Sequence, residues 1–156
     1  MDASILQILR RADDLEHWEC PIDFPRENEV ARVIALQPLL EKVVGNKLIL
    51  DRNVEDAAYF AELSWQADPR PEPGIGGQVI LTYLAIRFSA FGQLVTLWGN
   101  VPEAPIPSSL EEQLCRILLN AGYKVIPAQV LDGPYDGQHK FKSQITTWWL
   151  RYFDYC

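Results

Sequence analysis

The chain has 156 residues, of which 48% are hydrophobic and 22% are charged, the proportions of a folded globular domain. A domain of this length buries enough surface to fold without disulfide or metal staples. Its 14 basic and 21 acidic side chains give a formal net charge of −7, and no stretch concentrates basic residues. This balance argues against binding to nucleic acids or anionic membranes, because both carry negative charge.

Three segments place apolar residues at the three- and four-residue spacing of an amphipathic helix. They are residues 3–15, 25–45 and 108–121. Gly45 and Gly122 end the last two, where a left-handed residue commonly terminates a helix. Ser109 and Glu112 are expected to form a capping box. Pro38 interrupts the second pattern, so that helix either bends there or is split in two.

The centre of the predicted sheet is the nearly uncharged stretch Gln78–Asn100. Two β-rich segments, 79–88 and 93–98, flank a short connection in which Gly92 supplies the positive φ of a tight turn. The pattern predicts an antiparallel hairpin that forms the core of the fold.

Residues 57–66 alternate, with Tyr59, Ala61, Leu63 and Trp65 on one face of a half-buried strand. The alternative is a helix that begins near Val54 after an Asn53 cap, but aromatic content and strict alternation favour the strand. Shorter strands are predicted at 47–51 and 123–130. Together these elements predict a single α+β domain over residues 1–156. An antiparallel meander of about four strands is packed by two N-terminal helices and the helix at 108–121.

Two loops resemble ligand-binding motifs without matching them. The glycine-rich Gly74–Gly77 lacks the Lys-Ser/Thr pair and the following helix of a phosphate loop, so we interpret it as a hinge. The segment Asp132–Gly137 lacks the ligand spacing of a calcium loop, so a turn is expected there. The aromatic tail 145–155 fits a strand or a helix. It either docks into the core or presents an anchor for a partner or a homodimer.

Cys20, Cys115 and Cys156 are an odd number without metal-binding spacing, so we expect reduced thiols in a cytoplasmic protein. The acidic N-terminus fits neither a signal nor a transit peptide, and no apolar run is long enough to span a membrane. Neither His17 nor His139 belongs to a metal-binding pattern, and both are expected on the surface. Carboxylates beside Cys20 make it a poor nucleophile. We therefore expect no catalytic residue, metal or cofactor.

The most acidic window is 13–29, where seven carboxylates face one arginine. It predicts a surface for a basic protein partner, in the manner of immunity or adaptor proteins, which the chain matches in charge and size only. The candidate contact residues are Asp13, Asp14, Glu16, Trp18, Glu19, Asp23 and Phe24.

The alternative function is a small ligand-binding protein or a carboxylate-dependent enzyme with a pocket beside the central sheet. Its candidate lining residues are Tyr83, Arg87, Trp98 and Trp149. Arg87 is the only charge in the central stretch. It would either clamp an anion or pair with Glu62 on the neighbouring strand. We favour the interaction module, because no catalytic motif is present.

Overall fold

The computed structural model describes residues 3–71 and 78–156, and it has the predicted α+β fold. The helices of the described residues are α1 (Ala3–Ala12), α2 (Arg26–Val44), α3 (Ser108–Asn120), α4 (Ala128–Leu131) and α5 (Trp148–Tyr152). The strands are β1 (Ile49–Asp51), β2 (Tyr59–Gln66), β3 (Arg70–Pro71), β4 (Gln78–Val79), β5 (Thr82–Ser89), β6 (Leu94–Trp98) and β7 (Lys124–Val125). No helix in these residues is both long and apolar enough to cross a membrane.

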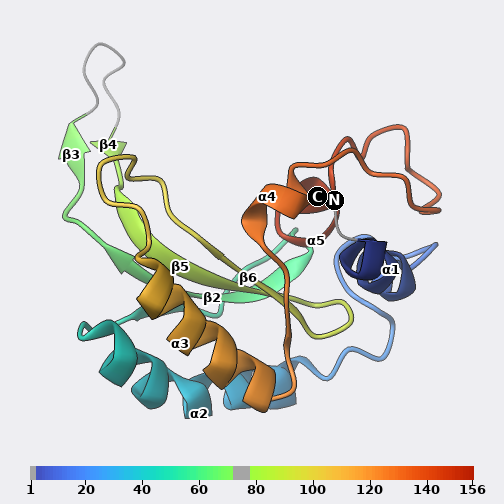
Figure 1. The fold of residues 1–156 in the computed structure, drawn as a ribbon. Coiled ribbons are helices and arrows are strands. Elements are labelled where there is room, and N and C mark those ends of the chain that lie inside the picture. Colours follow the sequence, from blue (N-terminus) through green and yellow to red (C-terminus); the bar gives the residue numbers. More distant parts are fainter. Residues whose placement is uncertain (1–2, 72–77) are drawn as a thin grey trace.

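The main sheet has the order β1-β2-β5-β6-β7, and β3 pairs separately with β4. Strands β1, β2, β5 and β6 are antiparallel neighbours, whereas β7 runs parallel to β6. The predicted meander of β2, β5 and β6 is therefore confirmed. Helices α2 and α3 cover one face of the sheet, and α1, α4 and α5 gather at the end where β5 turns into β6 (Figure 1).

The turn between β5 and β6 anchors that end of the fold. Gly92 has the predicted positive φ, +57°, and a Cβ at this position would meet the Ala12 Cβ at 2.6 Å. Two reasons therefore require glycine at position 92: its backbone conformation and the close approach of α1. The neighbouring Phe91 is buried and contacts Tyr152 of α5. The hairpin tip thus joins both ends of the chain.

The second helix is continuous through Pro38 and ends at Gly45, whose φ is +76° and whose N–H donates to the Glu41 carbonyl at 2.8 Å. Of the two alternatives at Pro38, a split into two helices is therefore wrong. Proline has no N–H, so the helix lacks the backbone hydrogen bond that residue 38 would otherwise donate.

The predicted capping box of α3 is wrong. The helix begins at Ser108 as predicted, but its N-cap is the extended Pro107, two residues before Ser109, and no side chain caps it. Ser109 is already inside the helix, so its hydroxyl cannot reach the first free amides. At the other end, Gly122 has the expected left-handed conformation, with φ +89°.

The strand predicted over 123–130 forms only at Lys124–Val125. Pro127, which lacks an N–H, ends the ladder and precedes α4. The tail, left open between strand and helix, folds as α5, and the Thr147 hydroxyl caps it by accepting from the Leu150 N–H at 3.2 Å. The alternative helix at Val54 is wrong, since β2 occupies that region. Because β2 lies between β1 and β5 and has a register shift at its start, Tyr59 and Phe60 are both buried.

Candidate functional site: a buried arginine clasp and an acid-lined cavity

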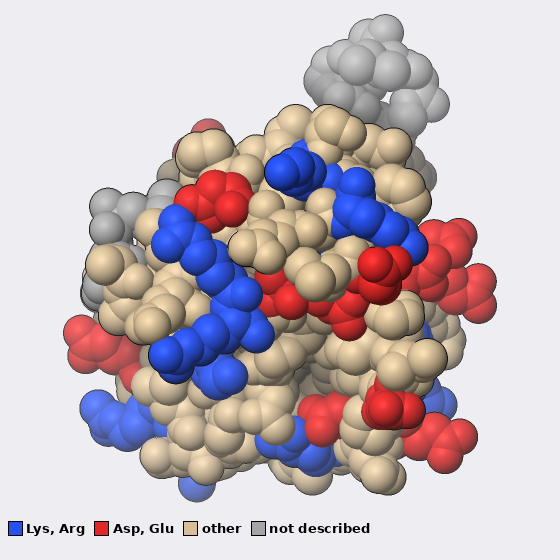
Figure 2. Space-filling model, turned by 90° about the vertical axis from the view of Figure 1, so that its right-hand side faces the viewer, with Lys and Arg blue, Asp and Glu red and all other residues tan. Residues whose placement is uncertain are grey.

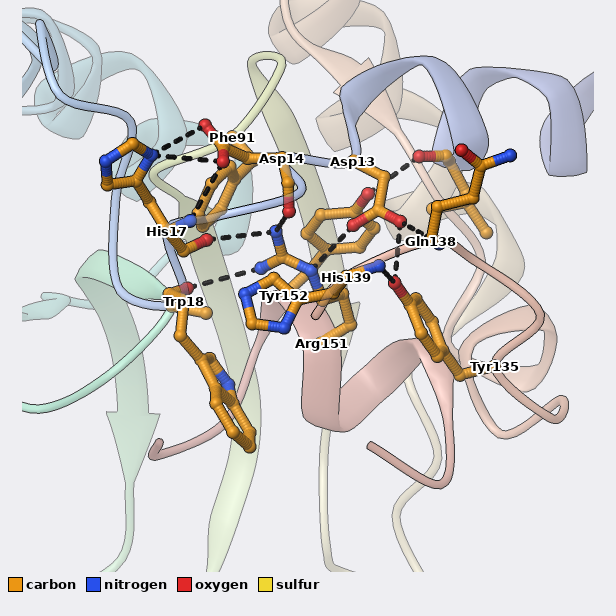
Figure 3. Close-up of polar contacts among 12 residues, drawn as sticks. Asp13, Asp14, His17, Trp18, Phe91, Tyr135, Gln138, His139, Arg151 and Tyr152 are labelled. Carbon is orange, nitrogen blue, oxygen red and sulfur yellow. Dashed lines mark hydrogen bonds and ion pairs between the residues drawn. The ribbon is translucent and has the colours of Figure 1, made fainter. Parts of the chain in front are cut away.

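Arg151 is fully buried, and it holds the segment that follows α1 against α5 (Figure 3). Its Nε donates to Asp13 Oδ1 at 2.8 Å, and its Nη atoms donate to the carbonyls of Asp14, His17 and Trp18 at 3.1–3.3 Å. Its guanidinium also lies 4.3 Å from the ring centre of Phe91. A buried charge is tolerated only with such partners, so this arginine determines the path of the acidic segment.

The Asp13 carboxylate, 4% exposed, completes the arrangement through its second oxygen. Oδ2 accepts from the Tyr135 hydroxyl at 2.6 Å and from the Gln138 N–H at 2.9 Å. Burial, together with the hydrogen bond to Asp13, raises the pKa of Tyr135 to about 12. We call residues 13–18, residues 135–141 and Arg151 the clasp.

Two exposed ion pairs lie on the surface of the clasp: Lys140 pairs with Glu16 inside it, and Asp136 pairs with Arg10 of α1. On this face of the molecule, basic and acidic side chains lie close to one another (Figure 2). Acidic and basic side chains thus neutralise one another on this face. Little negative electrostatic potential remains there to attract a basic partner.

Asp14 is also engaged within the chain. Its carboxylate accepts from the amides of Glu16 and His17 at 2.8 and 2.9 Å, and it faces the His17 ring. Burial acts to raise the Asp14 pKa, but these hydrogen bonds outweigh it and hold the pKa below its usual range.

Three of the predicted contact carboxylates, Asp13, Asp14 and Glu16, therefore have partners within the chain, although the pair of Glu16 with Lys140 is exposed. The two aromatic candidates are partly buried as well: Trp18 packs on His139 and Phe141, and Phe24 packs on Phe60. Glu19 and Asp23 differ from the rest, since neither has an ion-pair or hydrogen-bond partner for its carboxylate within residues 3–71 and 78–156.

Glu19 lines a cavity of about 530 Å³ between the acidic window and the start of β2. The loop before β2 adds Glu55 and Asp56 to its wall, and neither carboxylate has a hydrogen-bonding or ion-pair partner in the described part of the chain. Asp56 has a left-handed backbone, with φ +53°, a conformation that aspartate tolerates. We call this the rim cavity. Its other lining residues are Cys20, Arg26, Arg52, Asn53, Val54, Ala57, Tyr59, Phe60 and Ala90.

An exposed aromatic side chain, Tyr155, lies beside the rim cavity. Tyr155 is 57% exposed, pairs through its backbone with Ala57 and packs its ring on Tyr59 at 5.7 Å. Ile22, 81% exposed, follows Glu19 by three residues. The sequence analysis did not identify Glu55 or Asp56 as site residues, and it named Tyr155 only as part of the aromatic tail 145–155 that either docks into the core or anchors a partner. No local pattern marks them, because the fold alone brings the chain end and the β1–β2 loop to residue 19.

The four residues of the alternative pocket do not line one cavity. Arg87 donates to Glu62 at 2.5 Å and to the Phe153 carbonyl at 2.6 Å, so the predicted cross-strand pairing with Glu62 is confirmed. The rings of Tyr59, Trp98 and Trp149 surround its guanidinium at 4.2, 5.0 and 5.5 Å. Arg87 is therefore neutralised internally and is not free to clamp an anion.

Tyr83 and Trp98 line a different cavity, of about 410 Å³, whose wall includes neither Arg87 nor Trp149. This cavity lies beside the proline-rich segment that precedes α3, and its one charged lining residue is Glu111. It offers shape and apolar surface but few polar groups that would orient a ligand.

The structure also places the remaining candidate groups. Cys20, Cys115 and Cys156 are free thiols, and burial, followed by the charge of Glu19, raises the pKa of Cys20. The described residues contain no cluster of three or more metal-ligating side chains. The expected surface position of His139 is wrong: it is 1% exposed, inside the clasp. The glycine hinge Gly74–Gly77 lies outside the described residues.

Comparison with protein-family models, with curated proteins and with solved structures found no match in any of the three. What the protein does must therefore be inferred from its own charges, cavities and exposed side chains.

Proposed function

We propose that the protein is a non-enzymatic interaction module that binds a basic protein partner at the rim cavity. The observation that carries this proposal is the convergence of Glu19, Glu55 and Asp56 on one cavity without an internal ion pair. Elsewhere in the acidic window, Asp13, Asp14 and Glu16 are satisfied within the chain. Carboxylates that the fold leaves unpaired remain available for cations supplied from outside.

The surroundings suit a lysine or arginine side chain. The accessible wall of the cavity is mainly polar. Val54, Ala57 and Phe60 are nearly buried and add a small apolar patch, which the aliphatic stem can contact while its charged end reaches the carboxylates. Tyr155, whose ring packs on the lining residue Tyr59, adds exposed apolar surface beside the cavity. Large hydrophobic side chains beside charged ones are typical of the energetically important part of an interface.

Two arginines also line the cavity. Arg26 donates to the Val54 carbonyl at 2.5 Å, so its donors serve the loop in part. The guanidinium of Arg52 has no hydrogen-bond or ion-pair partner in the described residues, so it would pair with an acidic residue at the edge of a mostly basic partner surface. Such mixed charges fix the orientation of a complex more than they raise its affinity.

The test compares two triple charge reversals of equal net charge. The rim variant is Glu19→Lys, Glu55→Lys and Asp56→Lys. The control variant is Glu103→Lys, Glu112→Lys and Asp132→Lys, three exposed carboxylates that do not line the rim cavity. Binding of a decalysine peptide at low salt is followed by NMR, with amide shifts mapped onto the chain.

We expect the peptide to change the amide chemical shifts of residues 19–23 and 53–57 in the wild-type protein. The rim variant should bind the peptide about tenfold more weakly, because three exposed ion pairs are lost. The control variant should keep the mapped site. Equal weakening in both variants would mean that the peptide senses only the net charge, and the rim cavity would then be rejected as a specific site. Retention of a protein from native lysate by wild type and control but not by the rim variant would identify a partner.

A further inference from the structure

His139 is a buried imidazole with one of its two nitrogens unpartnered. Its Nδ1 accepts the Phe141 N–H at 3.1 Å, so the neutral ring carries its proton on Nε2. That Nε2 has no hydrogen-bond partner among the described residues. The rings of Trp18 and Phe141 each lie 5.6 Å from the imidazole centre and separate it from solvent.

The backbone N–H groups of the four consecutive residues 138–141 all donate hydrogen bonds that form only while the loop lies against the segment 13–18 and the Tyr135 side chain. Gln138 donates to Asp13 Oδ2, and Lys140 donates to the Leu15 carbonyl, both at 2.9 Å. His139 donates to the Tyr135 hydroxyl at 2.9 Å, and Phe141 donates to the imidazole itself. None of these four bonds belongs to a sheet or a helix, so breaking them would leave the hydrogen bonds of the sheet and helices in place.

Protonation of His139 would break this arrangement. A second ring proton, on Nδ1, would point at the Phe141 N–H, so an acceptor is replaced by a donor. Arg151 on α5 and Lys140 on the same loop oppose the added positive charge. Asp13 and Asp14 favour it, but Asp13 is already paired with Arg151, and Tyr135 stays neutral. The balance, led by burial, holds the pKa of His139 below its ordinary 6.5.

The direction of the pH effect follows from linkage. The folded clasp holds the neutral ring, whereas an opened loop exposes a histidine of ordinary pKa. The stabilising contribution is therefore complete above pH 6.5, and it declines as the pH falls from 6.5 toward the lowered pKa. Hydrogen bonds hold the pKa of Asp14 below its usual range, and the pair with Arg10 does the same for Asp136, so these two carboxylates keep their charge in this window.

We propose that His139 is an acid-sensitive latch, whose protonation releases residues 135–141 from the segment 13–18 while the sheet remains folded. Release would expose Trp18 and Phe141 and free the carboxylate of Asp13 from Tyr135 and Gln138. The latch is independent of what binds at the rim cavity, and it is a property of the isolated chain.

The test is amide hydrogen exchange at pH 7.5, 6.5 and 5.5, expressed as protection factors for residues 138–141 and for β5. The pKa of His139 is followed in the same samples by its ring proton shift. His139→Asn places an amide oxygen near the Nδ1 position and cannot be protonated. His17→Asn, which removes the half-exposed histidine beside Asp14, is the matched control.

We expect wild type and His17→Asn to lose protection at residues 138–141 on acidification. Protection should fall by about tenfold for each pH unit below 6.5 until the lowered pKa of His139 is reached, so the loss between pH 7.5 and 5.5 is at most about tenfold, while β5 stays protected. His139→Asn should lose this pH dependence. A His139 pKa at or above 6.5, or unchanged pH dependence in His139→Asn, would overturn the latch. Should His139→Asn fail to fold, the wild-type titration and exchange data decide alone.

Discussion

Replacing Asp13 by asparagine should destabilise the protein strongly, because it leaves the buried charge of Arg151 without its counter-ion. The Asp13 side chain is 4% exposed and that of Arg151 is fully buried, so water cannot replace the lost carboxylate. The asparagine amide also cannot accept from Arg151, Tyr135 and Gln138 together, since one of its two polar atoms is a donor.

The size of the effect follows from measured buried ion pairs, in which removal of one partner costs about 3–5 kcal/mol of unfolding free energy. That is a large part of the roughly 5–15 kcal/mol that stabilises a typical domain. The double variant Asp13→Asn with Arg151→Met removes both charges, so it should lose less than the sum of the two single changes. The expected difference is about 2 kcal/mol.

Urea denaturation followed by tryptophan fluorescence measures these differences. With a slope of about 2 kcal/mol per molar urea, Asp13→Asn should lower the midpoint by about 1.5–2.5 M. Asp136→Asn is the control, because it removes a carboxylate from the same region whose pair with Arg10 is half exposed, and its midpoint should barely move. If Asp13→Asn shifted the midpoint no further than Asp136→Asn, the ion pair would not stabilise the fold as argued.

Two further predictions concern the turn and the thiols. Gly92→Ala should lower the free energy of unfolding more than Gly45→Ala, although both glycines have positive φ. Only at Gly92 would the new Cβ meet another atom closely, the Ala12 Cβ at 2.6 Å. Equal shifts of the urea midpoint in the two variants would contradict this close approach. Alkylation of Cys20 by iodoacetamide should be slow at pH 7, because burial and the charge of Glu19 raise the pKa of the thiol. The reaction should be faster in Glu19→Gln. An unchanged rate in that variant would mean that Glu19 does not raise the pKa of Cys20.

Local sequence patterns predicted most of the secondary structure. Apolar spacing located α1, α2 and α3, and Gly45, Gly92 and Gly122 marked the backbone positions where a positive φ was needed. The errors arose where neighbours in space outweighed the local pattern. The strand predicted over 123–130 is only two residues long, because Pro127 cannot donate to the ladder. The tail, which fits a strand or a helix by its sequence, forms a helix that buries Trp148 and Tyr152.

Sequence by itself determined the acidic balance of the chain and the position of the acidic window, but the tertiary structure decided what each carboxylate does. Asp13 and Glu19 lie six residues apart in one window, yet Asp13 is buried against Arg151, 138 residues away, and Glu19 lines an open cavity. Periodicity reflects local geometry and can be read along the chain. The role of a charge depends on its distance to other charges and to water, and only the folded chain sets those distances.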